Sequence, residues 1–300
     1  METMVKDIAI IISTNGMENA LLDSVNSLIR EQYQYCGLYI VGNVCLEEKE
    51  KRFRMQYNSF SSKCQFIDCK WNGDATVFSE GIKEAIKDGY KYLWLLQEGM
   101  KVHAGSLEKL IYYDQKLNGE YGFLASAVLD GKELYKRYQP LIDENIVWSK
   151  YNQLELKLFP VECCAFSGLF FHSCDVENVG LPISSMNVGY DGYEFTKRLG
   201  EIKNGYFVVD SCVEYCVQDN IQYDICIDDN VEIYKYVYRN DLYLARKKGL
   251  KYIGFYFFRF IKAIVDIVAR SKNKKWYRLE QIMLGTLMGL VYHPQIEKMN

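Results

Sequence analysis

The first half of the chain alternates between short apolar runs and segments with helical periodicity. The apolar runs are continuous, which is typical of strands buried on both faces. They are DIAIIIST at 7–14, LYIVGN at 38–43, CQFIDC at 64–69 and KYLWLL at 91–96. Between them, residues 18–32 and 72–89 carry apolar side chains at helical spacing, and a charged segment at 47–57 is also helical in pattern. This order predicts a doubly wound α/β sheet.

Each predicted strand ends in a polar or glycine-rich tip. The tips are Thr-Asn-Gly at 14–16, Gly-Asn at 42–43, Asn-Gly-Asp at 72–74 and Gln-Glu-Gly at 97–99. Doubly wound sheets bind ligands beyond the carboxyl ends of their strands, so these tips form a candidate crevice. The alternative is that the strands simply end in turns, where Asn and Gly are common.

The middle third of the chain is less regular. The segment EYGFLASAVL at 120–129 has the composition of a further strand pair. Farther on, Asp191 and Glu194 stand one helical turn apart and therefore share a face. Asp191 either caps the N-terminus of a helix, where aspartate is favoured, or forms with Glu194 a carboxylate pair such as hydrolases use.

The C-terminal segment is basic and amphipathic. Residues 246–278 contain eleven Lys or Arg side chains and one acid, Asp266. In GFYFFRFIKAIVDIVAR at 254–270, the charged residues follow one stripe, and Phe, Ile and Val cover the rest. Such a helix can lie in the headgroup region of an anionic membrane. The alternatives are a helix packed on the rest of the chain with a solvated basic edge, and a dimer contact.

Composition narrows the class of protein. The chain has 300 residues, of which 49% are hydrophobic and 25% charged, as in ordinary soluble domains. A net charge of -3 gives no global sign of nucleic-acid binding. The ten cysteines form no CxxC pair, and METMVKDIAI lacks the pattern of a signal peptide, so we expect reduced, cytosolic thiols. No apolar run reaches the roughly 20 residues that span a bilayer.

Longer segments follow one another in a characteristic order. They are IIISTNGMENALLDSVNSL, NGDATVFSEGIKEAIKDGYKYLWLLQEGMKVHAGSLEKL, FSGLFFHSCDVENVGLP, GYDGYEFTKRL, YKYVYRNDLYLARKKG and the closing IMLGTLMGLVYH. This set resembles the family 2 glycosyltransferases with a GT-A fold, in particular the bacterial rhamnosyl- and galactofuranosyl-transferase-like branch. The resemblance covers nearly the whole chain, although no single motif is specific. It implies a doubly wound, mixed α/β GT-A domain over residues 1–220 and a helical, basic amphipathic extension over 221–300.

The resemblance also implies a reaction. In this family a sugar passes, with inversion, from a nucleotide-sugar donor to a saccharide acceptor, here expected to be lipid-linked, in the assembly of bacterial surface polysaccharide. A base deprotonates the acceptor, and a divalent cation, Mg²⁺ or Mn²⁺, supports the departing diphosphate. We therefore expect a cytoplasmic protein, peripheral at the inner face of the cell membrane through residues 246–278, with no nucleic-acid partner. The protein could also form a homo- or hetero-oligomer, which the sequence does not decide.

The strand tips carry the expected donor site, but with fewer acids than the family has. The acid that usually ends the second strand is Gly42 here, and the acidic Asp-Xaa-Asp cluster after the fourth strand is Gln97-Glu98-Gly99. Glu98 is therefore the candidate metal ligand. The residues that the resemblance assigns to nucleotide-sugar binding are Thr14, Asn15, Asn43, Gly73, Asp74 and Glu98.

The expected catalytic acids are Asp191 and Glu194. When the later family motif is aligned on Glu194, its first acid is Asp191 and its second, usually the base, is Gly192. Asp191 is therefore the candidate base. Because the departures fall at positions that do chemistry, the sequence leaves a second function open: a non-catalytic glycosyltransferase-like partner or saccharide-binding protein that keeps the fold.

Overall fold

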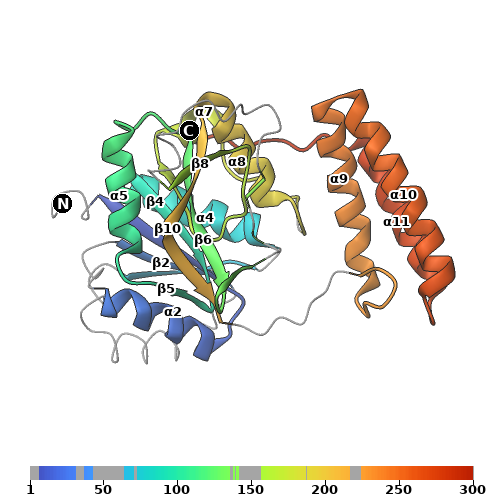
Figure 1. The fold of residues 1–300 in the computed structure, drawn as a ribbon, viewed down its shortest axis with the longest axis horizontal. Coiled ribbons are helices and arrows are strands. Elements are labelled where there is room, and N and C mark those ends of the chain that lie inside the picture. Colours follow the sequence, from blue (N-terminus) through green and yellow to red (C-terminus); the bar gives the residue numbers. More distant parts are fainter. Residues whose placement is uncertain are drawn as a thin grey trace. The chain divides into compact units, whose positions relative to one another are not determined.

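The chain divides into two compact units (Figure 1). The computed structural model describes residues 7–31, 37–42, 64–70, 73–135, 138, 140–141, 157–186, 188–216 and 224–299. The sheet unit comprises Met1–Ser184, Gly192–Val217 and Ile296–Asn300, and the helical unit comprises Ser185–Asp191 and Gln218–Gln295. Compared with the expected division at 220/221, the helical unit also takes in residues 185–191, and the last five residues belong to the sheet unit.

A mixed sheet forms the centre of the sheet unit. Its strands are β1 Ile8–Thr14, β2 Gly37–Gly42, β3 Cys64–Asp68, β4 Tyr92–Gln97, β5 Met100–Val102, β6 Phe123–Asp130, β7 Glu133–Leu134, β8 Leu158–Val161, β9 Leu169–His172 and β10 Gly205–Tyr215. The order is β3-β2-β1-β4-β9-β6-β10-β5, with β7 paired to β6 and β8 to β10. Strands β1 to β4 run parallel, whereas β9 is antiparallel to β4 and β6. The predicted doubly wound, mixed α/β sheet is confirmed.

Helices cover both faces of this sheet. They are α2 Glu18–Arg30, α4 Asp74–Lys87, α5 Ser106–Lys116, α7 Asp175–Val179 and α8 Asp191–Ile202. Alternate residues of β1 enter two separate cores: Ile8, Ile10 and Ile12 join the core with α2 and α5, while Ala9 and Ile11 join the core with α4, α7 and α8. Since side chains of a strand point alternately to opposite faces, a strand between two cores needs an unbroken apolar run, which β1 has.

Most predicted strands agree with the structure, and one prediction is wrong. The runs at 7–14, 38–43, 64–69 and 91–96 correspond to β1–β4 within one residue at either end. The strand pair predicted at 120–129 is instead one long strand, β6, whose short partner β7 begins only at Glu133. The charged segment at 47–57 lies outside the described residues.

The helical unit consists of three long helices and a short helical turn in its described part. They are η3 Val231–Ile233, α9 Tyr234–Lys248, α10 Leu250–Arg270 and α11 Lys275–Val291. Helix α9 packs against both α10 and α11. Tyr234, Ile267 and Ile282 form one apolar cluster, and Leu242 and Tyr256 belong to a second. The helices in the described ranges are too short or too polar to cross a membrane.

Candidate functional site

The carboxyl ends of β1, β2 and β4 meet at one edge of the sheet. In the parallel register, Thr14 pairs with Gly42 and Ser13 pairs with Gln97. Helix α4 begins at this edge, because its first residue, Asp74, contacts the side chains of Ser13 and Gln97. We call the polar residues gathered here the strand-tip site: Ser13, Thr14, Asp74, Gln97, Glu98 and Ser167.

Glu98 is a buried carboxylate that holds the loop after β1. The residue is 6% exposed. Its Oε1 accepts the N–H of Asn15 at 2.9 Å, and its Oε2 accepts the Thr14 hydroxyl at 2.5 Å and the N–H of Met17 at 3.2 Å. The Thr14 hydroxyl oxygen in turn accepts the N–H of Gly16 at 3.0 Å. Burying a charge is unfavourable unless donors surround it, and here both oxygens are used in holding the fold.

A network of neutral donors and one carboxylate lies beside Glu98. The amide nitrogen of Gln97 donates to Asp74 Oδ2 at 2.5 Å, and its oxygen accepts the Ser167 hydroxyl at 2.7 Å. The Ser13 hydroxyl donates to Asp74 Oδ1 at 3.4 Å. Sequence reasoning did not identify Ser13 or Ser167. Their only signal was position, since Ser13 adjoins the first strand tip and Ser167 lies within the segment FSGLFF.

The strand-tip site does not fit a cation held by carboxylates. Mg²⁺ and Mn²⁺ bind oxygen ligands, chiefly carboxylates with free lone pairs. In the described part of the chain, the carboxylates bonded to the ends of β1 and β4 are Asp74, which is partly exposed, and Glu98, whose oxygens hold the loop. Among those same residues, no three His, Cys, Asp or Glu side chains are grouped to hold a metal ion. Glu98 as a metal ligand stays a prediction, and it would require the loop to give up some of these hydrogen bonds.

Gly42, at the end of β2, has little room for a side chain. Its φ of 144° is one that residues with a side chain rarely adopt, and a Cβ built there would lie 1.9 Å from the carbonyl oxygen of Thr14. A carboxylate at position 42 therefore requires β1 and β2 to move apart. Asn43, the next predicted ligand, lies outside the described residues.

The start of α8 is equally crowded. The helix docks on the segment before β9 through Thr196, whose hydroxyl donates to the carbonyl of Cys164 and accepts its N–H, both at 2.9 Å. A Cβ on Gly192 would lie 2.7 Å from the backbone nitrogen of Phe166. The position that the resemblance assigns to the base thus has no room for a side chain unless the backbone shifts. Asp191, partly exposed, is the acid that remains there as the first residue of α8.

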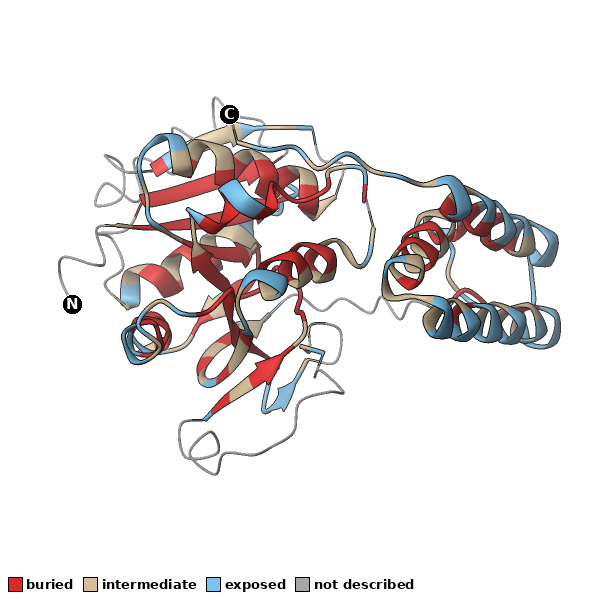
Figure 2. Cartoon of the chain, turned by 90° about the horizontal axis from the view of Figure 1, so that it is seen from above, coloured by how far each residue is buried: buried red, intermediate tan, exposed pale blue. Residues whose placement is uncertain are grey.

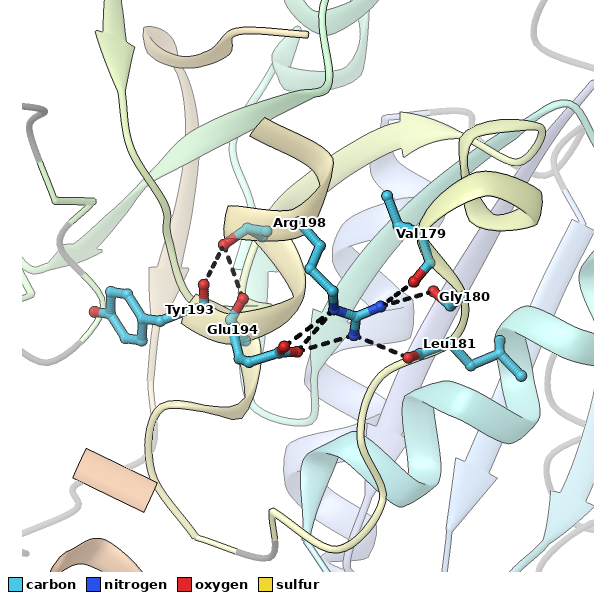
Figure 3. Close-up of polar contacts among 8 residues, drawn as sticks. Val179, Gly180, Leu181, Tyr193, Glu194 and Arg198 are labelled. Atoms are coloured by element: carbon cyan, nitrogen blue, oxygen red, sulfur yellow. Dashed lines mark hydrogen bonds and ion pairs between the residues drawn. The ribbon is translucent and has the colours of Figure 1, made fainter. Parts of the chain in front are cut away.

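Glu194 has surroundings unlike those of Asp191. Glu194 is 2% exposed, and the Nε of Arg198 donates to both of its oxygens, at 3.1 and 2.9 Å. Figure 3 shows the same guanidinium reaching the segment that ends α7, where it donates to the carbonyl oxygens of Val179, Gly180 and Leu181. The buried pair therefore fastens α8 to that segment, and the carboxylate of Glu194 is occupied.

The structure thus brings together only part of the predicted site. Thr14, Asp74 and Glu98 share the network at the strand tips, with the exposed Asn15 in the adjoining loop and Gly73 just before α4. Asp191 and Glu194 lie on α8, one turn apart.

Comparison with known proteins identifies the fold. No protein-family model matches the chain, and no curated protein matches its sequence. Among solved structures, S. aureus TarS 1–349 matches 92% of this chain and 70% of its own length, with a TM-score of 0.53 and 9% identity. A second match is GalNAc-T7 with UDP, GalNAc and Mn²⁺, with a TM-score of 0.55 and 14% identity. The match covers 92% of this chain and 56% of that one. The chain has the GT-A glycosyltransferase fold.

The contacts of Glu98 predict the effect of removing its charge. In Glu98→Gln, an amide group replaces one oxygen that accepts hydrogen bonds from the loop. We expect the free energy of unfolding, measured by urea denaturation in EDTA, to fall by about 1–3 kcal/mol. Glu133→Gln, an exposed acid on β7, should change it little. An unaltered metal-free stability, with loss of a stabilising effect of Mn²⁺, would instead identify Glu98 as a metal ligand.

The close contact of Gly192 predicts a second effect. In Gly192→Ala the new methyl group meets the backbone of residues 165–166, so we expect the free energy of unfolding to fall by about 1–3 kcal/mol. Gly254→Ala is the matched control, because a Cβ there meets no atom within 4 Å and alanine favours a helix. Thermal denaturation of both variants measures the difference, and equal melting temperatures would contradict the steric explanation.

Proposed function

We propose that the chain is a glycosyltransferase that moves a sugar from a nucleotide-sugar donor to a saccharide acceptor, with inversion at the anomeric carbon. The observation that carries the proposal is the strand-tip site, which lies where sheets of this kind bind ligands. In support, solved structures with the same fold include TarS 1–349 in complex with UDP-GlcNAc, with a TM-score of 0.50 and 8% identity over 92% of this chain and 71% of that one.

The nucleotide end of the donor would lie against the strand tips. Asn15 is exposed in the loop that Glu98 holds, and its side chain can bind the nucleotide. Gly73 leaves the backbone before α4 open to close approach, and the Asp74 carboxylate can accept an N–H or O–H from the base or ribose. We propose that Asn43 also binds the nucleotide. Glu98 contributes by fixing the loop.

Asp191 would act on the acceptor. Its carboxylate takes the proton of the acceptor hydroxyl while that oxygen bonds to the anomeric carbon. The bond from the anomeric carbon to the diphosphate breaks on the opposite face, and the diphosphate leaves with the electron pair. The N-terminus of α8 favours a negative charge at Asp191. Glu194 fixes α8 through Arg198, and no step passes through a divalent cation, which the described strand tips do not fit.

The class of sugar and acceptor rests on the resemblance in segment order alone. It supports rhamnose or galactofuranose as the sugar, and a lipid-linked saccharide of bacterial surface-polysaccharide assembly as the acceptor. An acceptor of this kind is held at a membrane, so the protein would work at the cytoplasmic face of one.

The helical unit supports a membrane-peripheral protein. Helix α10 exposes Leu250, Phe257, Phe258, Ile261, Val265 and Val268, and α11 exposes Trp276, Met283, Leu284, Leu287, Leu290 and Val291. In Figure 2 the long helices of the helical unit are coloured as exposed along much of their length. Residues 224–295 contain thirteen Lys and Arg against seven Asp and Glu. Apolar side chains flanked by cations suit an anionic lipid surface, so we propose docking through 246–278 and the adjoining face of α11.

A second candidate function is a non-catalytic partner or saccharide-binding protein. The packing around Gly42 and Gly192 favours it, because two positions that bear acids in the family have no room for any side chain. Calorimetric titration with UDP and with dTDP separates the two candidates. Binding of either nucleotide in EDTA supports the enzyme, and an absence of binding by both supports the partner.

Substitution of Asp191 tests the mechanism. We expect Asp191→Asn to lower kcat by about 10²- to 10⁴-fold, because the amide cannot take the acceptor proton. The measurement is release of nucleoside diphosphate from a panel of UDP- and dTDP-sugars with a soluble saccharide acceptor. Glu201→Gln, an exposed acid on the same helix, is the control and should keep the wild-type rate. Undiminished turnover by Asp191→Asn would rule Asp191 out as the base.

Vesicle binding tests the membrane proposal. We expect the protein to sediment with phosphatidylglycerol vesicles more than with phosphatidylcholine vesicles, and less as salt rises, since salt screens the attraction. Leu287→Glu should weaken binding several-fold because it places a charge on the apolar face of α11. Leu134→Glu is the control, an exposed leucine on β7. Concentration-dependent dimers without vesicle binding would show that a second copy covers this face.

A further inference from the structure

The loop that leads into α8 is held by the helical unit. Arg239, on α9, donates to the carbonyl of Ser185 at 2.5 Å. The neighbouring Asn240, which is fully buried, donates to the carbonyls of Val188 at 2.9 Å and Gly189 at 3.3 Å. These bonds run from side chains of one helix to three carbonyls of the loop. The backbone at Ser185, Val188 and Gly189 is therefore held by α9.

The end of this loop is fastened by Tyr190. Gly189 and Tyr190 both have left-handed backbones, with φ of 65° and 66°, a conformation that is unfavourable for tyrosine and needs support from its surroundings. Arg259 supplies that support from α10, through a hydrogen bond to the Tyr190 side chain. Arg259 is itself oriented by Asp241 on α9, whose two oxygens it binds at 2.8 Å each.

The phenol of Tyr190 stays neutral in this position. Burial, and next the negative charge of Asp241, raise the pKa of Tyr190 to about 12, while Arg259 lowers it. The side chain therefore keeps its proton at neutral pH, and its oxygen remains available to Arg259. The Tyr190 side chain thus connects its own loop to α10 through Arg259. The ion pair of Arg259 with Asp241 extends the connection to α9.

We infer that Tyr190 and Arg259, with Asp241 behind them, are positioning residues for Asp191. The reason is covalent: Asp191 follows Tyr190 directly, so the torsions of Tyr190 decide where the Asp191 carboxylate points. A base works only when its oxygen lies within hydrogen-bonding reach of the acceptor proton. The inference rests on the proposed function of Asp191 and extends it, because it assigns the helical unit a part in transfer that is separate from docking on lipid.

A positioning role and a merely structural role have different kinetic signatures. Loss of positioning lowers kcat and leaves the KM for the donor unchanged, because donor binding does not involve these residues. Loss of structure lowers the amount of folded protein and the melting temperature instead. Hydrogen exchange at the amides of residues 186–191 gives a readout that needs no enzyme activity.

The experiment compares Arg259→Ala with the wild type, without lipid, using the soluble acceptor and the donor that the wild type consumes from the UDP- and dTDP-sugar panel. We expect kcat to fall about 10- to 100-fold with the donor KM within about twofold. Exchange at 186–191 should rise about tenfold or more. Tyr190→Phe removes only the hydroxyl and should show the same direction of change. If Arg259→Ala fails to fold, Tyr190→Phe still tests the inference.

Lys235→Ala, on α9, is the matched control, because it removes a different cation of the helical unit from an ion pair, with Glu232 at 2.8 Å, and should change none of these quantities. Unchanged kcat in both Arg259→Ala and Tyr190→Phe would overturn the inference, whatever the exchange shows. A wild-type chain that consumes no donor overturns the proposed function and the positioning role with it. Faster exchange in Arg259→Ala would then still show that the pair anchors the loop.

Discussion

The carboxylate of Glu98 connects the end of β4 to the loop that follows β1. Buried beside that loop, the charge depends on the Thr14 hydroxyl and on the N–H groups of Asn15 and Met17. Those N–H groups depend equally on the carboxylate, because a buried donor without a partner is costly. The strand end and the loop therefore specify each other. This mutual dependence sets the position of Asn15 at the edge of the sheet. It also sets the residue at which α2 begins.

This arrangement decides what kind of surface the strand tips offer. A carboxylate whose oxygens already accept donors from the loop has little left for a cation, and the neighbouring Gln97 is a neutral amide bonded at both ends. Within the strand-tip site, Asp74 is a carboxylate that also reaches solvent, and Asp68, at the end of β3, is a further exposed one. The described edge therefore offers a ligand hydroxyls, amides and carboxylates that are not paired with one another.

Much of the fold could be predicted from the sequence, because strands between two cores need unbroken apolar runs and amphipathic helices need a spacing near 3.6. β1 to β4 and α10 were found in this way. The place of β9 between β4 and β6 was not, since the four residues LFFH carry no period that distinguishes parallel from antiparallel pairing. The partnership of Gln97 with Ser167 spans 70 residues, and local pattern says nothing about such a pair. Residue type alone also cannot tell a carboxylate that holds a loop from one that holds a metal.

The packing of Gly42 bears on how this chain can change over generations. One nucleotide change turns two of the four glycine codons into aspartate codons, so an acid at position 42 is genetically close. The Cβ that comes with it would lie 1.9 Å from the carbonyl oxygen of Thr14, so the backbone where β1 pairs with β2 would have to shift. An acid at position 42 therefore needs compensating substitutions that reshape the contact between β1 and β2. The glycine thus disfavours the gain of an acid at the end of β2.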